Sequence, residues 1–121
     1  MSDKDITIFE LKQKVQKFCE DRNWDQFHSP KDLIIGVITE AGELLEPFRF
    51  KSDKEIEEML SDKSKRDAIG AELADVLYFL IRFSQRNNFD LSSLLIKKLA
   101  ENDKKYPIGK AKDSNKKYTE L

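Results

Sequence analysis

The stretch from Ala68 to Ile81, AIGAELADVLYFLI, decides the fold class of this chain. It contains only two charged side chains, Glu72 and Asp75, which lie three positions apart. A helix that is apolar on nearly every side is typical of a protein interior. We therefore predict a core helix over residues 66–86, with both carboxylates on one face of it.

The segments around this core helix repeat their apolar residues with a helical period. Helices are expected over residues 6–22, 30–46 and 91–105, with one or two helical turns around residues 55–60. Ser29 and Asp90 are the expected N-caps of two of these helices, and Pro47 is the expected stop of one. Since no segment alternates as a strand does, the prediction is an all-α fold with four principal helices.

The end of the chain, residues 106–121, is polar and has no helical period. We expect it to be an extended C-terminal tail, either disordered or laid over the surface. Residues 1–105 then form one all-α domain, which agrees with a total length of 121 residues.

The composition excludes several classes of function. Its 22 basic and 23 acidic residues leave a net charge of -1, unlike a protein that neutralises nucleic-acid phosphates. There is no apolar run long enough to span a membrane, and the charged N-terminus lacks the apolar segment of a signal peptide. We expect a cytoplasmic protein with neither a nucleic-acid polymer nor a membrane as partner.

A second pair of carboxylates, Glu40 and Glu43, lies in the apolar helix predicted over residues 30–46. If the two apolar helices face each other, the four carboxylates come within about 6 Å. Each like-charge pair then costs on the order of 3 kcal/mol at an effective dielectric constant of about 20. Such a group requires protonation or a bound cation. Oxygen-only ligands favour Mg2+, with Mn2+ as the other candidate.

Other interpretations of the four carboxylates are weighed against this one. Buried arginines can neutralise them instead, and the nearest in sequence are Arg66, Arg82 and Arg86. A di-iron centre requires Glu-x-x-His on two helices, whereas the single histidine, His28, lies in a predicted loop. The single cysteine, Cys19, likewise excludes a Cys/His zinc site.

Aromatic and cationic residues elsewhere in the chain are candidates for binding the rest of a phosphate-bearing ligand. They are Trp24, Phe27 and His28 before the second helix, Phe48, Arg49 and Phe50 after it, and Lys97, Lys98, Asn102, Lys104 and Lys105 in the last helix. Aromatic side chains stack on nucleobases. Taken singly, each residue is better explained as a hydrophobic cover or a solvated face than as a ligand contact.

With these motifs collected, the sequence resembles the MazG-like all-α nucleoside triphosphate pyrophosphohydrolases, and within them the dCTP pyrophosphatase branch. The superfamily motif E-x-x-E followed by E-x-x-D is matched at residues 40–43 and 72–75. Three further segments match the branch: RNWDQFHSP at 22–30, NDKKYP at 102–107 and KKYTEL at 116–121.

The resemblance implies a four-helix MazG-like bundle that assembles as a homo-oligomer, either a dimer or a tetramer. It implies cleavage of a (d)NTP, with dCTP or a related pyrimidine nucleotide first, to the monophosphate and pyrophosphate. The implied Mg2+ ligands and catalytic residues are Glu40, Glu43, Glu72 and Asp75. The implied substrate contacts are Trp24, Gln26, His28, Phe50, Phe79, Lys98 and Asn102.

Three positions depart from the branch: Phe50, Phe79 and Val15 stand where its members carry Trp, Tyr and His. They concern the base rather than the phosphates, so dUTP or a modified nucleotide is an alternative substrate. A helical interaction module with an acidic face is an alternative of another class. The apolar neighbours of Glu72 and Asp75 disfavour it, because a solvated acidic face is polar around its carboxylates.

Overall fold

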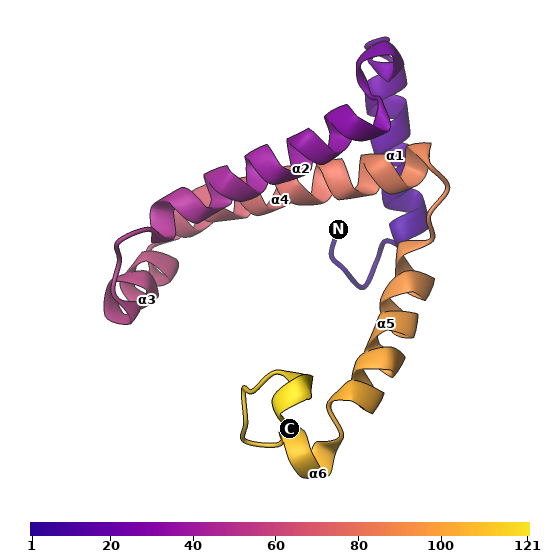
Figure 1. The fold of residues 1–121 in the computed structure, drawn as a ribbon. Coiled ribbons are helices and arrows are strands. Elements are labelled where there is room, and N and C mark those ends of the chain that lie inside the picture. The colour runs from indigo at the N-terminus through magenta and orange to yellow at the C-terminus, as the bar shows by residue number, and fades with distance from the viewer. The chain divides into compact units, whose positions relative to one another are not determined.

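The computed structural model describes residues 1–121 and consists of helices and turns (Figure 1). The α-helices are α1 (Ile8–Glu20), α2 (Pro30–Leu45), α3 (Asp53–Ser61), α4 (Lys63–Arg86), α5 (Leu91–Lys105) and α6 (Ile108–Ala111). Three single 3-10 turns are η1 (Asp25–Phe27), η2 (Glu46–Phe48) and η3 (Tyr118–Glu120). The all-α prediction is confirmed. None of these helices combines the length and hydropathy that crossing a membrane requires.

The ends of the helices follow local capping chemistry. The Ser29 side chain accepts a hydrogen bond from the Asp32 backbone N–H, and Asp90 caps α5 in the same way, as predicted. The turns predicted around residues 55–60 form the nine-residue helix α3, which begins with a capping box between Ser52 and Glu55. The core helix begins at Lys63 rather than at residue 66, because its N-cap lies directly after α3.

Contacts within the chain divide it into two compact units, Met1–Asn88 and Phe89–Leu121. In the second unit, the rings of Tyr106 and Tyr118 meet edge to face, and the Lys105 ammonium lies over the Tyr118 ring. Residues 106–121, expected as an extended tail, therefore contain α6 and η3 and fold back on the end of α5. The division into a domain at 1–105 and a tail stays a prediction.

The first unit is built around the pair α2 and α4, which lie side by side (Figure 1). Gly36 faces Phe79 closely: a Cβ atom on Gly36 would lie 2.5 Å from the Phe79 ring. Because Glu43 and Glu72 meet further along the pair, the two helices run antiparallel. The helices α1 and α3 pack against α4. This antiparallel pairing is what brings the two acidic motifs together.

Candidate metal and nucleotide site

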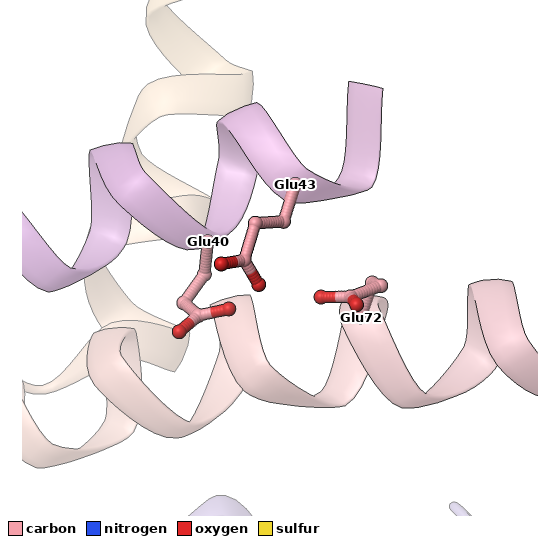
Figure 2. Close-up of side chains that lie close together, drawn as sticks. All are labelled: Glu40, Glu43 and Glu72. Atoms are coloured by element: carbon pink, nitrogen blue, oxygen red, sulfur yellow. The ribbon is translucent and has the colours of Figure 1, made fainter. Parts of the chain in front are cut away.

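Three carboxylates from the two acidic motifs converge between α2 and α4. Figure 2 shows Glu40 and Glu43 reaching from α2 toward α4, where Glu72 lies. Each of the three residues offers a carboxylate oxygen, and these oxygens all lie within 4.8 Å of one another. The three-residue spacing in α2 places both of its glutamates on the face that α4 covers. We call Glu40, Glu43 and Glu72 the acidic cluster.

The acidic cluster has no basic side chain to neutralise it among the arginines nearest in sequence. Arg66 donates to the backbone carbonyl of Leu60, while Arg82 and Arg86 pair with Asp25. These engagements contradict the interpretation that buried arginines neutralise the cluster. One carboxylate oxygen of Glu40 and one of Glu72 are buried without any hydrogen-bond partner.

Crowding of like charges raises two pKa values in the acidic cluster. The pKa of Glu40 is raised first by a hydrogen bond shared with Glu43, then by burial and by the charges of Glu43, Asp75 and Glu72. The pKa of Glu72 is raised mainly by burial and by the charges of Glu43 and Asp75. Asp75 therefore acts on the cluster, although its oxygens are outside the 4.8 Å group.

These features fit a hard divalent cation. The available ligands are carboxylate oxygens, two of them buried and unpartnered, and their mutual repulsion falls when a positive charge lies among them. The oxygen-only cluster therefore supports a metal site here.

A cavity of about 510 Å³ lies beside Asp75, between α1 and α4. It is lined by Lys14, Val15, Phe18, Trp24, Ala74, Asp75 and Tyr78. The ring of Phe18 meets those of Trp24 and Tyr78 edge to face, at centroid distances of 5.7 and 6.2 Å. We call this space the aromatic cavity. Its lining includes a predicted metal ligand, Asp75, and a predicted substrate contact, Trp24.

A larger cavity of about 950 Å³ is lined by two of the other three motif carboxylates, Glu43 and Glu72, and by residues of α3 and the start of α4. Lys51 and Lys65 also line it, together with four further acidic residues: Glu46, Glu55, Glu58 and Asp62. Three of the four motif carboxylates thus line cavities, Asp75 an aromatic one and Glu43 and Glu72 a strongly charged one.

The remaining predicted substrate residues of the first unit have distinct surroundings. Gln26 donates from its amide to the Asn23 carbonyl, and His28 accepts from Arg82. Phe50 is 94% exposed and its φ of 59° is left-handed, next to Lys51 at the rim of the larger cavity. Phe79 lines neither cavity, because its ring packs on Gly36 and meets the Tyr78 ring.

Two predicted phosphate contacts, Lys98 and Asn102, belong to α5 in the second unit. The Lys98 ammonium lies 3.8 Å from a Glu101 carboxylate oxygen, and the Asn102 carbonyl accepts from the Tyr106 backbone N–H. Their role toward the carboxylates of the first unit stays a prediction.

The sequence analysis missed several residues that shape the site. Phe18 and Tyr78 complete the aromatic cavity, and the Tyr78 hydroxyl lies 3.0 Å from the Cys19 sulfur. Burial and this contact raise the pKa of Tyr78. The role of Arg82 also differs from the expected one, because it does not neutralise the carboxylates but pairs with Asp25 and His28. Its position seven residues after Asp75, on the same face of an apolar helix, is the signal that was available.

Comparisons with known proteins agree with this fold. A model of the MazG-like family matches residues 35–121. Proteins named dCTP pyrophosphatase 1 from Rattus norvegicus and Homo sapiens are each 35% identical over 115 residues, covering 95% of this chain and 68% of theirs. A crystal structure of a pyrophosphatase from Archaeoglobus fulgidus is similar with a TM-score of 0.77 and 30% identity, covering 83% of this chain and 92% of that one. This chain belongs to the MazG-like family, in its dCTP pyrophosphatase-like branch.

Proposed function

We propose that this chain is a Mg2+-dependent nucleoside triphosphate pyrophosphohydrolase that acts on dCTP or a related pyrimidine nucleotide. Its class as a nucleotide pyrophosphohydrolase follows from the family, and the metal and the base are our proposal. The observation that carries the proposal is the acidic cluster with its two buried, unpartnered oxygens, Glu40 Oε2 and Glu72 Oε2.

The four motif carboxylates would hold the cation: Glu40, Glu43, Glu72 and Asp75. When bound, Mg2+ supplies positive charge to the phosphate oxygens and lowers the pKa of the attacking water. A carboxylate oxygen of the same group that does not ligate the metal orients that water and accepts its proton. The water oxygen then bonds to the α-phosphorus as the bond from this phosphorus to the bridging oxygen breaks. The products are the monophosphate and pyrophosphate.

The aromatic cavity is the proposed place of the base. Its volume of about 510 Å³ lies in the range of small-ligand sites. Trp24 supplies an aromatic face on which a base can stack, and Asp75 connects the cavity to the metal ligands. Gln26 and His28, on the turn that follows Trp24, are proposed contacts to the nucleoside.

Four further proposed contacts lie outside the aromatic cavity. Phe50 is an exposed ring that directly precedes Lys51, a residue lining the larger cavity, and is proposed to cover a bound nucleotide. Phe79 affects the aromatic cavity instead, because its ring meets that of Tyr78, which lines this cavity. Lys98 and Asn102 are proposed phosphate contacts, on the basis of the family motif in α5.

A related substrate, dUTP or a modified pyrimidine nucleotide, is the second candidate. The observation that favours it is the lining of the aromatic cavity, where Val15 stands in place of a branch histidine and the only tyrosine is Tyr78. Of the three departures, Val15 therefore lies on the proposed base site, and Phe79 contacts Tyr78 in its wall. They change which base fits without altering the carboxylates that hold the phosphates.

The test is chromatographic analysis of products after incubation with Mg2+ and each NTP, dNTP and methylated dNTP separately. We expect monophosphate and pyrophosphate from one or a few pyrimidine nucleotides. Glu43→Gln should abolish turnover, whereas Glu57→Gln, the same change at an exposed position of α3, should not. Diphosphate plus phosphate, or equal turnover by both variants, would contradict the proposed reaction.

We further propose that the chain self-associates as a dimer or tetramer through α2 and α4. Exposed apolar residues follow both helices: Ile34, Ile35, Ile38, Leu45, Leu73, Leu77 and Leu80. An apolar surface of this kind on paired helices is typical of an interface between subunits. Light scattering should give a multiple of 14.2 kDa. Ile38→Glu should lower the measured mass and Phe9→Glu on α1 should not, while a monomeric wild type would contradict the proposal.

A further inference from the structure

A fully buried arginine, Arg82 of α4, ties the turn η1 to that helix. Its Nε donates to His28 Nδ1 at 2.9 Å, its Nη1 donates to Gln85 Oε1 at 2.6 Å, and its Nη2 donates to the Asp25 carboxylate. Arg86 adds a bond to the Asp25 backbone carbonyl. All three nitrogens of the buried guanidinium therefore have acceptors, two of them on or next to η1.

This geometry fixes the protonation of His28. Because Nδ1 accepts from Arg82, the ring proton of a neutral imidazole must be on Nε2. Burial and the positive charges of Arg82 and Arg86 lower the pKa of His28, against a smaller opposing effect of Asp25. The imidazole is thus a neutral ring with Nε2 as a hydrogen-bond donor near pH 7.

The turn that Arg82 holds begins at Trp24, a wall of the aromatic cavity. The Trp24 ring contacts the His28 ring edge to face at a centroid distance of 6.1 Å. On its other side Trp24 meets Phe18, and its backbone N–H donates to the Cys19 carbonyl of α1. Trp24 is therefore held from α1 at one side and, through His28 and Asp25, from α4 at the other.

Resting on the proposed function, we propose that Arg82 is a positioning residue for nucleotide binding. It holds the turn from Trp24 to His28 against α4 and selects the His28 tautomer, so that the aromatic wall and the imidazole donor are in place before the nucleotide arrives. Arg82 lies two helical turns beyond Asp75 and contacts none of the metal-ligand carboxylates. Its loss should therefore weaken binding while leaving the chemical step intact.

The test compares Arg82→Met, Arg82→Lys and the matched control Arg66→Met on the same helix, in the full chain with Mg2+. For Arg82→Met we expect KM for the preferred nucleotide to rise about tenfold while kcat stays within about twofold. Arg82→Lys should fall between this variant and the wild type, because one ammonium cannot bridge three acceptors. Arg66→Met should match the wild type.

A second readout does not depend on turnover. Trp24 is the only tryptophan, so its emission spectrum in the nucleotide-free protein reports on the turn directly. Arg82→Met should shift this emission to longer wavelength at unchanged helix content. If the wild type hydrolyses no nucleotide, the proposed function fails while the emission still decides whether Arg82 holds Trp24.

Several results would overturn the proposal. One is an Arg82→Met protein that folds and has the emission and KM of Arg66→Met. Another is a loss confined to kcat, which would place Arg82 in the chemical step. If Arg82→Met does not fold, Asp25→Asn decides, because it weakens the same link from a half-exposed position. An unchanged KM and emission in that variant would also overturn the proposal.

Discussion

The helix α4 carries two charged regions, the carboxylates Glu72 and Asp75 and, two turns after Asp75, the guanidinium of Arg82. The two regions differ in whether their charged atoms have partners. Around Glu72 and Asp75 the charges have one sign, and buried oxygens lack partners. Around Arg82, by contrast, every guanidinium nitrogen donates to an acceptor. A buried charge with all its partners fixes the position of a segment, whereas a group of like charges without partners requires either protonation or a ligand of opposite charge.

The largest effect is expected from Glu43→Gln in the acidic cluster. Removing one carboxylate charge from the proposed metal ligands should lower kcat by on the order of a thousandfold, since positioning and charge stabilisation both fail. The fold should persist, because the change relieves repulsion among carboxylates. Turnover and thermal unfolding measured on one preparation check both halves of this prediction, and a less stable, active variant would contradict it.

The next largest effect is expected from Arg82→Ala at the partnered group. The change removes the three hydrogen bonds of a buried guanidinium and leaves a cavity, so the free energy of unfolding should fall by about 3 kcal/mol. Urea denaturation measures it. If stability were unaffected, the Arg82 group would not be the structural counterpart of the acidic cluster.

A smaller effect should appear in the pH dependence of metal-free stability. The raised pKa values of Glu40 and Glu72 mean that the folded state retains protons which the unfolded state releases. Their contribution therefore destabilises the fold as the pH rises above the ordinary glutamate value and through the raised values. Mg2+ should raise Tm by about 4 °C at pH 7.5 and by less at pH 5.

The control for this effect is the double variant Glu40→Gln/Glu72→Gln. It removes both titrating groups, so the difference in Tm between wild type and variant gives their contribution alone. Asp25 is present in both proteins, and its lowered pKa makes the fold more stable as the pH rises. A Mg2+ shift of equal size at both pH values, or one retained in the double variant, would refute the assignment.

The smallest effect is expected at an ordinary surface ion pair. Lys17 and Asp21 are 2.8 Å apart on α1, and both side chains are largely exposed. Asp21→Ala should lower the free energy of unfolding by only about 0.3 kcal/mol. A loss as large as that of Arg82→Ala would show that burial is not what distinguishes the two kinds of pair.

Much of the fold was predictable because helical period and caps are local signals. The motif spacing likewise placed Glu40 with Glu43, and Glu72 with Asp75, on single faces. The start of α4 was missed because its first residues are polar and carry no hydrophobic period. The start of α3, by contrast, has a local signal in the S-x-x-E pattern at residues 52–55.

The aromatic cavity was less predictable. It depends on Phe18, Trp24 and Tyr78, which come from three segments of the chain and meet only when α1 packs on α4. The ion pair between Arg82 and Asp25 also joins distant parts of the sequence, because the two residues lie 57 positions apart. A pairing of this range is fixed by tertiary packing, and no local pattern specifies it.

Binding of Mg2+ tests the central claim most directly. Titration calorimetry at pH 7.5 compares the metal-free wild type, Glu72→Gln and the exposed control Glu57→Gln. The unpartnered acidic cluster predicts that the wild type and Glu57→Gln bind Mg2+ alike and that Glu72→Gln binds at least about tenfold more weakly. Absence of binding by the wild type, or equal affinity in Glu72→Gln, would contradict a cation site between α2 and α4.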